Sequence, residues 1–148
     1  MRSLAPILLL VSAGRGACSA VSRASTTPTP ATAEVGTIAQ VYYWRAKPGK
    51  FDEYTRYVRD IAEPIDAEGQ RNGAFISVTT FMTRDTTSAW THMRIFVLRD
   101  STQLRELSGK LDAAGVRLEP DSVKRRVRGE YSATLRDRVG AATVAILR

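Results

Sequence analysis

Cysteine and histidine are almost absent from this 148-residue sequence, which contains one residue of each. A single cysteine excludes an internal disulfide framework and a four-thiolate zinc site, since both need several thiols. A metal site would have to rest mostly on carboxylates, because only one imidazole is available. The sequence therefore predicts no metal centre.

Long apolar runs are also scarce, and the run near the start covers only residues 4–11. A helix needs roughly 20 apolar residues to cross a bilayer, so this run is too short for a permanent span. Arg2 precedes the run and small residues follow it, which is typical of a signal peptide over residues 1–20. We therefore expect an exported protein, periplasmic or extracellular.

Cys18 leaves two outcomes open for this signal. The sequence Gly16-Ala17-Cys18 resembles the end of a bacterial lipoprotein signal, in which the cysteine is acylated and becomes the first mature residue. Arg15 stands where such signals carry an aliphatic residue, and ordinary cleavage after Ala20 is the alternative. In the first case a lipid on Cys18 anchors the protein to a membrane, and in the second the protein is released.

The segment after the signal is poor in apolar residues. Residues 22–33 include two prolines and no large apolar side chain, so they cannot bury enough surface to offset their ordering entropy. We expect a disordered linker over residues 21–34 and one folded domain over residues 35–148.

Positive charge is in excess, with a formal net charge of +7. Its densest run is Lys124-Arg125-Arg126, which the ordinary interpretation makes the solvated face of an amphipathic helix. The alternative is contact with an anionic membrane surface beside a lipid anchor. The sequence carries no phosphate-binding glycine loop and no single-strand-binding motif, so we do not expect nucleic acid as a partner.

The folded part begins with a strand and a helix. Aromatic and β-branched residues over 37–45 predict a strand that closes at Pro48-Gly49. Apolar residues then recur every three or four positions, which predicts an amphipathic helix over residues 50–69. Pro64 lies inside that pattern and removes one backbone hydrogen bond, so we expect a kink there.

Two strands over residues 74–83 and 89–98 are expected next, paired antiparallel through a short polar loop. Asp100 can cap a following helix, and Pro120 opens a further helical stretch. Residues 141–147 mix alanine, a helix former, with residues that favour strands, so a final strand and a helix continuation both stay open.

This order of elements predicts an α+β protein of the ferredoxin-like split βαβ type, an antiparallel sheet with helices on one face. Aromatic residues occur on both faces of the predicted sheet, and one face would be left in water. A second copy of the chain could cover this exposed face, so we expect a homodimer.

A resemblance to a known family supports this expectation. The strand Val41-Tyr42-Tyr43-Trp44, the following Lys47-Pro48-Gly49-Lys50 and a helix with an aromatic at Tyr54 resemble the opening of the dimeric α/β-barrel superfamily. That superfamily includes antibiotic-biosynthesis monooxygenases, haem-degrading monooxygenases and many small uncharacterised proteins. The resemblance implies two sheets paired into a barrel, with a small-molecule pocket inside.

In such a barrel, the sheet face away from the helices would line the interior. Strand alternation is expected to place six aromatic or polar side chains on that face: Gln40, Tyr42, Trp44, Trp90, His92 and Arg94. The indoles could stack on a flat ligand while the polar groups fix its orientation. We therefore predict a ligand site for a small, partly aromatic molecule.

His92 is the candidate for acid–base catalysis, since its ordinary pKa lies near neutrality. Each residue also has a structural interpretation. Trp44 and Trp90 could belong to the core or the dimer interface, His92 could be hydrogen-bonded in the fold, and Arg94 could pair with Asp85 or Glu53.

Three hypotheses on function remain, and no cofactor follows from the sequence. The leading one is an exported protein that binds a small molecule in a dimeric barrel. The second is a monooxygenase-type oxidoreductase that uses His92. Haem-degrading members carry an Asn, Trp and His set, whereas the single asparagine here, Asn72, lies in a loop. The third is a non-catalytic structural or interaction module at the cell surface.

Overall fold

A computed structural model describes residues 36–147 of the chain. The predicted signal peptide, the acylation of Cys18 and the linker lie outside the described residues. The elements are β1 (Ile38–Ala46), α1 (Phe51–Tyr57), a π-helical turn η1 (Val58–Ala62), α2 (Glu63–Arg71), β2 (Ser77–Met82), β3 (His92–Leu98), α3 (Ser101–Leu118), α4 (Ser122–Leu135) and β4 (Arg136–Ala145).

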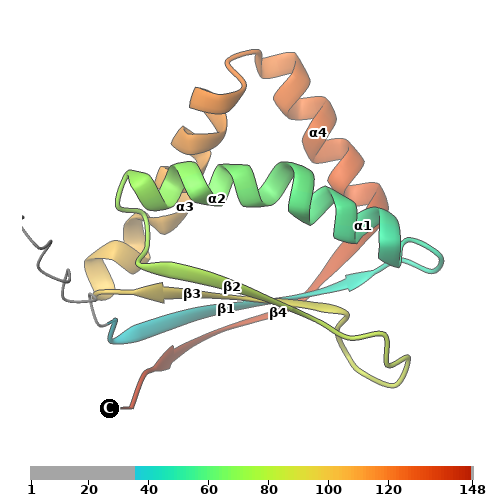
Figure 1. Ribbon diagram of the computed structural model, residues 1–148, viewed down its shortest axis with the longest axis horizontal. Helices are drawn as coiled ribbons and strands as arrows, with labels where there is room; N and C mark the ends of the chain where they lie inside the picture. The colour runs from blue at the N-terminus through green and yellow to red at the C-terminus, as the bar shows by residue number, and fades with distance from the viewer. Residues whose placement is uncertain (1–35, 148) are drawn as a thin grey trace, which may run out of the picture. The chain divides into compact units, whose positions relative to one another are not determined.

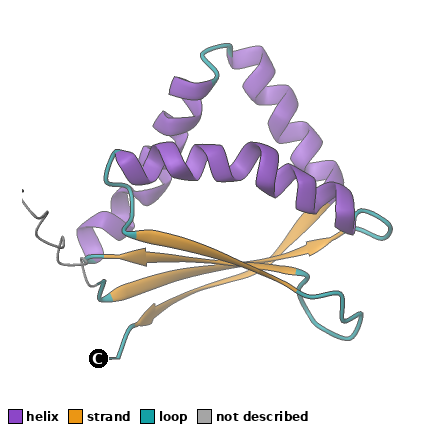
Figure 2. Ribbon diagram, in the orientation of Figure 1, coloured by secondary structure: helices purple, strands orange, loops and turns teal. Residues whose placement is uncertain are grey.

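The four strands form one antiparallel sheet in the order β2-β3-β1-β4. Within residues 36–147, helices cover one face of this sheet and the other face carries none (Figures 1 and 2). The fold is α+β, and its connectivity is consistent with the ferredoxin-like arrangement. The C-terminal stretch is a strand, and it starts directly after α4.

The predicted kink at Pro64 takes the form of a wide helical turn just before the proline. The N–H of Glu63 donates to the carbonyl of Val58, five residues earlier. Proline has no N–H to continue the usual four-residue pattern, and a π turn absorbs the missing bond without ending the helix. α1, η1 and α2 therefore form one interrupted helix over residues 51–71.

The core lies between the sheet and the helices, in two clusters. The first contains Ala74, Phe75, Phe96, Leu98 and Leu107, and the second contains Tyr54, Val58 and Leu135. Tyr42 packs against the first cluster and Trp44 against the second. β1 therefore presents two neighbouring aromatic rings where the two clusters meet.

Which face the helices cover was predicted wrongly. Tyr42, Trp44, His92 and Arg94 do share a face, as expected, since Tyr42 pairs with Arg94 and Trp44 with His92. That face lies under the helices, whereas the sequence placed Ala39, Val41 and Tyr43 there. Alternation identifies residues that share a face, but both faces of β1 are apolar, so the pattern does not say which one a helix covers.

Candidate functional site

A cavity of about 400 Å³ lies between the sheet and the helices, and we call it the helix-side cleft. β1, β3 and β4 form its floor, and η1, α2 and α3 form its walls. Its lining residues are Tyr42, Trp44, Tyr57, Ala62, Ile65, Asp66, Arg94, Phe96, Ser108, Leu111, Asp112, Arg136 and Arg138.

The floor of the cleft consists of two aromatic rings, each with an arginine stacked on it. The rings of Tyr42 and Trp44 are 5.5 Å apart between centroids. The guanidinium carbon of Arg136 lies 4.8 Å from the Trp44 ring, and that of Arg138 lies 4.8 Å from the Tyr42 ring. Arginine over an aromatic face is attracted by the ring quadrupole, so each ring holds its cation over the cleft.

A β-bulge places both arginines on the helix side. Trp44 pairs with Arg138, but the next residue back along β1, Tyr43, pairs with Gly140. Val139 is therefore an extra residue in β4. Bulges of this kind re-aim side chains, and this one sets both arginines on the same face as Thr143.

Neither arginine has a carboxylate partner among residues 36–147. Arg136 donates from Nε to the hydroxyl of Ser132 at 3.1 Å, and Arg138 makes its recorded contact with the Tyr42 ring alone. Asp112 also lines the cleft, but it forms no ion pair with either arginine. The floor of the cleft therefore carries two cations whose charge the described part of the protein leaves uncompensated.

Arg94, in contrast, has a carboxylate partner within the fold, although its Nε has no hydrogen-bond partner among the described residues. It forms an ion pair with Asp66 of α2, and the two residues are 7% and 5% exposed. Arg94 thus pairs with a carboxylate, as its structural interpretation allowed, but the partner is Asp66 and not Asp85 or Glu53, because α2 passes over this part of β3. Burial lowers the pKa of the Arg94 guanidinium. The pair fixes α2 across the cleft.

His92 is completely buried beneath α1. Its ring centroid is 4.4 Å from that of Tyr54, Nε2 lies 3.0 Å from the hydroxyl of Thr55, and Nδ1 lies 2.9 Å from the hydroxyl of Thr91. The Thr55 hydroxyl already donates to the carbonyl of Phe51, so it accepts from Nε2. The single proton of the Thr91 hydroxyl has two acceptors in reach, Nδ1 at 2.9 Å and the carbonyl of Trp44 at 3.4 Å; donation to the nearer Nδ1 leaves the ring neutral.

The surroundings of His92 also disfavour its charged form. Burial, together with the nearby cation of Arg136, lowers its pKa from 6.5 to about 4. Both ring nitrogens are bonded inside the protein, and His92 lines none of the described cavities. This geometry gives the predicted catalytic role no support.

Gln40 and Trp90 lie away from the cleft. Gln40 is buried, and its amide oxygen accepts from Thr143 of β4, so it holds two strands together. Trp90 precedes β3, and its ring lies 6.4 Å from that of Tyr43 on the opposite face. Strand alternation predicted that Trp90 and His92 share a face. Because β3 begins at His92, Trp90 lies outside the strand, where side chains need not alternate.

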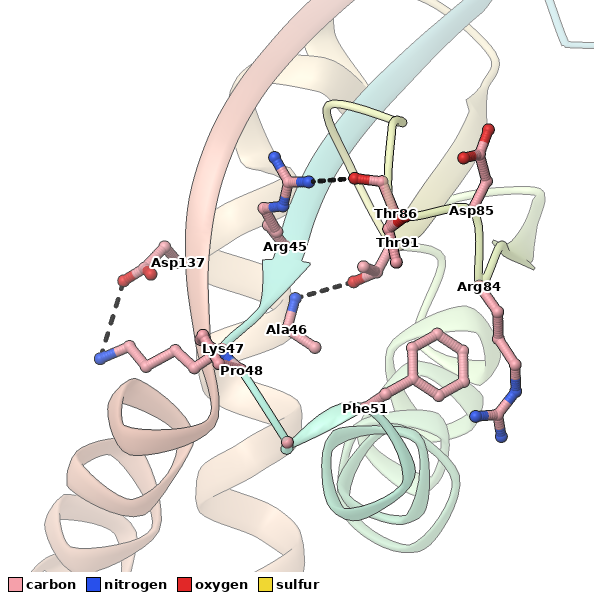
Figure 3. Close-up of a pocket in the computed structure, with 11 residues that line it drawn as sticks. Arg45, Ala46, Lys47, Pro48, Phe51, Arg84, Asp85, Thr86, Thr91 and Asp137 are labelled. Atoms are coloured by element: carbon pink, nitrogen blue, oxygen red, sulfur yellow. Dashed lines mark hydrogen bonds and ion pairs between the residues drawn. The ribbon is translucent and has the colours of Figure 1, made fainter.

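A second cavity, of about 460 Å³, lies at the end of the sheet beside the β2–β3 loop (Figure 3). Its three cations are already engaged. Arg45 donates to the carbonyl of Thr86 at 3.1 Å, Lys47 lies 3.8 Å from Asp137, and Arg84 is paired with Asp52. This cavity is the larger one, yet it offers a ligand less uncompensated charge than the helix-side cleft.

The described residues hold no group of three His, Cys, Asp or Glu side chains that could bind a metal ion. Over the same range, every helix is too short or too polar to span a membrane.

Comparisons with known proteins support the fold and leave the family undetermined. No protein-family model matches the sequence, and no curated protein matches it. The crystal structure of HapK from Hahella chejuensis is similar in fold, with a TM-score of 0.50 and 7% sequence identity, over 74% of this chain and 92% of HapK. At that identity the similarity concerns the fold alone.

Tyr42, Trp44 and Arg94, which the sequence predicted for a barrel interior, line the helix-side cleft instead, and Arg136 and Arg138 were not among the predicted residues. The two arginines lie between the predicted last helix and residues 141–147, in a stretch to which no element was assigned. Gly140, next to the extra residue, was the available signal, since an isolated glycine inside a strand pattern often marks a bulge.

Proposed function

We propose that this protein binds a small, planar, anionic molecule in the helix-side cleft. The observation that carries the proposal is the pair of arginines, Arg136 and Arg138, stacked on Trp44 and Tyr42 without a carboxylate partner in residues 36–147. A flat ring can contact the aromatic floor, and a carboxylate on it can accept from the guanidinium groups.

The size and composition of the cleft agree with such a ligand. Its volume of about 400 Å³ falls within the range of roughly 300–1,000 Å³ that small-molecule sites usually have. Aromatic and aliphatic side chains make up about half of the lining, and the rest are polar or charged: Asp66, Arg94, Ser108, Asp112, Arg136 and Arg138. The Nε N–H of buried Arg94 has no hydrogen-bond partner among the described residues, and a ligand oxygen could satisfy it.

The proposed site differs from the barrel interior that the sequence suggested, because it lies within one chain. We propose the second copy separately, on the face without helices, which we call the open face. Its exposed or half-buried apolar side chains are Tyr43, Phe81, Met93, Ile95, Val97 and Val144, and the charged Arg45 and Asp137 lie at one end. Because these two charges are opposite in sign, two copies can meet there in an isologous contact without a net like-charge repulsion.

The test of binding uses two probes of the same shape, 2-naphthoate and its neutral amide. Binding to the full chain can be followed through tryptophan fluorescence, because Trp44 lies in the floor of the cleft. Arg138→Gln removes one cation without breaking a hydrogen bond recorded in the structure. A hydrogen bond to a charged group contributes about 1.5–3 kcal/mol, but Arg138 is exposed and solvent screens part of this, so naphthoate should bind roughly five- to tenfold more weakly to this variant.

Two controls make the result specific. The amide should bind the wild type and Arg138→Gln within about twofold of each other, because it carries no charge for the arginine to attract. Arg126→Gln removes an exposed arginine paired with Glu130 on α4, away from the cleft, and should leave both affinities unchanged. Equal affinity of naphthoate for the wild type and Arg138→Gln, or stronger binding of the amide, would refute the proposal.

We base no catalytic step on His92, since its nitrogens are both occupied within the protein. A monooxygenase-type activity and a purely structural role stay as the predictions made from the sequence.

A further inference from the structure

A further cavity, of about 440 Å³, adjoins the helix-side cleft and lies between α3 and α4; we call it the α3–α4 cavity. Four residues line both spaces: Tyr57, Ile65, Leu111 and Asp112. Figure 1 shows α3 and α4 meeting at their connecting loop and diverging toward the sheet, with α2 crossing beside them. A molecule bound on the aromatic floor could therefore continue past Leu111 into the space between the two helices.

Two helical glycines border this cavity, Gly115 in the last turn of α3 and Gly129 in the middle of α4. Gly115 of α3 is buried, and Gly129 of α4 faces the same space. Glycine is the least favourable helix residue after proline. A Cβ at either position would meet no atom within 4 Å, so contacts within the described residues do not require glycine there. Larger side chains at these positions would project into the cavity.

The rest of the lining combines aliphatic and charged side chains. Ile65, Leu111 and Val116 supply aliphatic surface, whereas Asp112 and Arg128 add charged groups. Arg125 lines the cavity too, but its guanidinium donates to the carbonyls of Glu119 at 2.8 Å and Pro120 at 2.7 Å. That arginine is therefore occupied in holding the turn between the two helices.

We infer that the ligand is an amphiphile: its anionic aromatic head lies under Arg136 and Arg138, and its apolar tail extends into the α3–α4 cavity. The inference rests on the proposed function for the head and adds the tail. A linear alkyl chain on the ring is the chemistry that fits, because the added space continues the cleft along the aliphatic side chains of Ile65, Leu111 and Val116 and leaves room beside Gly115.

The experiment uses 4-alkoxybenzoates whose chains run from methoxy to octyloxy, bound to the full chain. Each buried methylene contributes about 0.8 kcal/mol, so affinity should rise up to roughly fourfold with each added carbon until the cavity is filled. Gly115→Leu places a side chain in the cavity. It should bind 4-methoxybenzoate as the wild type does and lose the gain from longer chains.

Gly109→Leu is the matched control, since Gly109 lies on α3, is exposed, and lines neither cavity. It should retain the full dependence on chain length. Val116→Asp is a second variant, which keeps the volume available but makes the cavity wall charged. It should weaken octyloxybenzoate and leave methoxybenzoate unaffected.

The outcomes separate the tail from the head. If methoxybenzoate binds through Arg138 but longer chains add nothing, the tail inference is wrong and the proposed function stands. A chain-length gain that persists in Gly115→Leu would also overturn the inference. If affinity grows with chain length but is the same in Arg138→Gln, the proposed function fails and the cavity binds apolar groups alone.

Discussion

The depressed pKa of His92 predicts that the protein loses stability in mild acid. The folded protein holds this side chain neutral, with a pKa of about 4, whereas the ordinary value is 6.5. Between these two values the unfolded chain binds one more proton than the folded chain. The free energy of unfolding therefore falls as the pH decreases from about 6.5 toward about 4, and it is unaffected by His92 above that window.

The size of the effect follows from the difference between the two pKa values. One pKa unit corresponds to about 1.36 kcal/mol, so His92 contributes at most about 3 kcal/mol of this loss. That is a large share of the 5–15 kcal/mol that stabilises a typical domain. The wild type should accordingly unfold at clearly lower urea concentrations at pH 4.5 than at pH 7.

The assay compares urea unfolding of the wild type and His92→Gln between pH 7 and pH 4.5. Glutamine keeps one donor and one acceptor but does not titrate in this range. The variant should be less stable at pH 7 and should lose less stability on acidification. Carboxylates such as Glu68, whose pKa hydrogen bonds from Arg71 and Arg117 lower to about 2, titrate alike in both proteins and cancel in the comparison.

A direct measurement can refute the reasoning. The sequence contains one histidine, so its imidazole signals in a proton NMR titration have a single assignment. A folded-state pKa near 6.5, or equal pH dependence of the wild type and His92→Gln, would show that the ring is accessible. The acid–base role predicted from the sequence would then regain its basis.

Two other predictions concern the fold and the assembly. Asp66→Asn leaves the buried Arg94 cation without its anionic partner, and the free energy of unfolding in urea should fall by about 3–5 kcal/mol. The double variant Arg94→Met with Asp66→Leu should recover much of this loss. An unchanged urea midpoint for Asp66→Asn would contradict the buried pair. Ile95→Lys puts a charge in the middle of the open face, so sedimentation should find a dimer for the wild type and a monomer for the variant; a wild type that stays monomeric at every concentration would rule out the second copy.

The order of elements could be predicted from the sequence because each signal was local. The turn at Pro48-Gly49, the helical periodicity after it and the Asp100 cap all act within a few residues. Asp100 does accept from the N–H groups of Thr102 and Gln103. Such signals do not depend on what packs above the sheet, and they gave the order from β1 to α4 correctly. The start of β3 was predicted three residues too early, and residues 136–140 of β4 were assigned to no element.

The covered face could not be predicted in the same way. On β1, one face carries Tyr42 and Trp44 and the other carries Val41 and Tyr43, so both faces are apolar. The choice depends on contacts with distant elements, such as the ion pair of Arg94 with Asp66, whose residues are far apart in the sequence. Trp90 was misplaced for a related reason, since alternation holds only where the backbone is extended.

The cleft depends most on a feature that no local pattern specifies, the register of β4 beside β1. Leu135 is fully buried at the end of α4, and its carbonyl accepts from the N–H of Lys47, which fixes where β4 begins. At its other end, Thr143 donates to Gln40 on the helix side. Without a bulge, a strand with Arg138 on the helix side would place Thr143 on the open face. The extra residue Val139 reverses the alternation, so that β4 can make both the contact at Leu135 and the hydrogen bond to Gln40. The position of the two arginines over the aromatic rings is thus a consequence of how β4 pairs with β1. Substitutions that shift this register should move both arginines out of the cleft while Trp44 and Tyr42 stay in place.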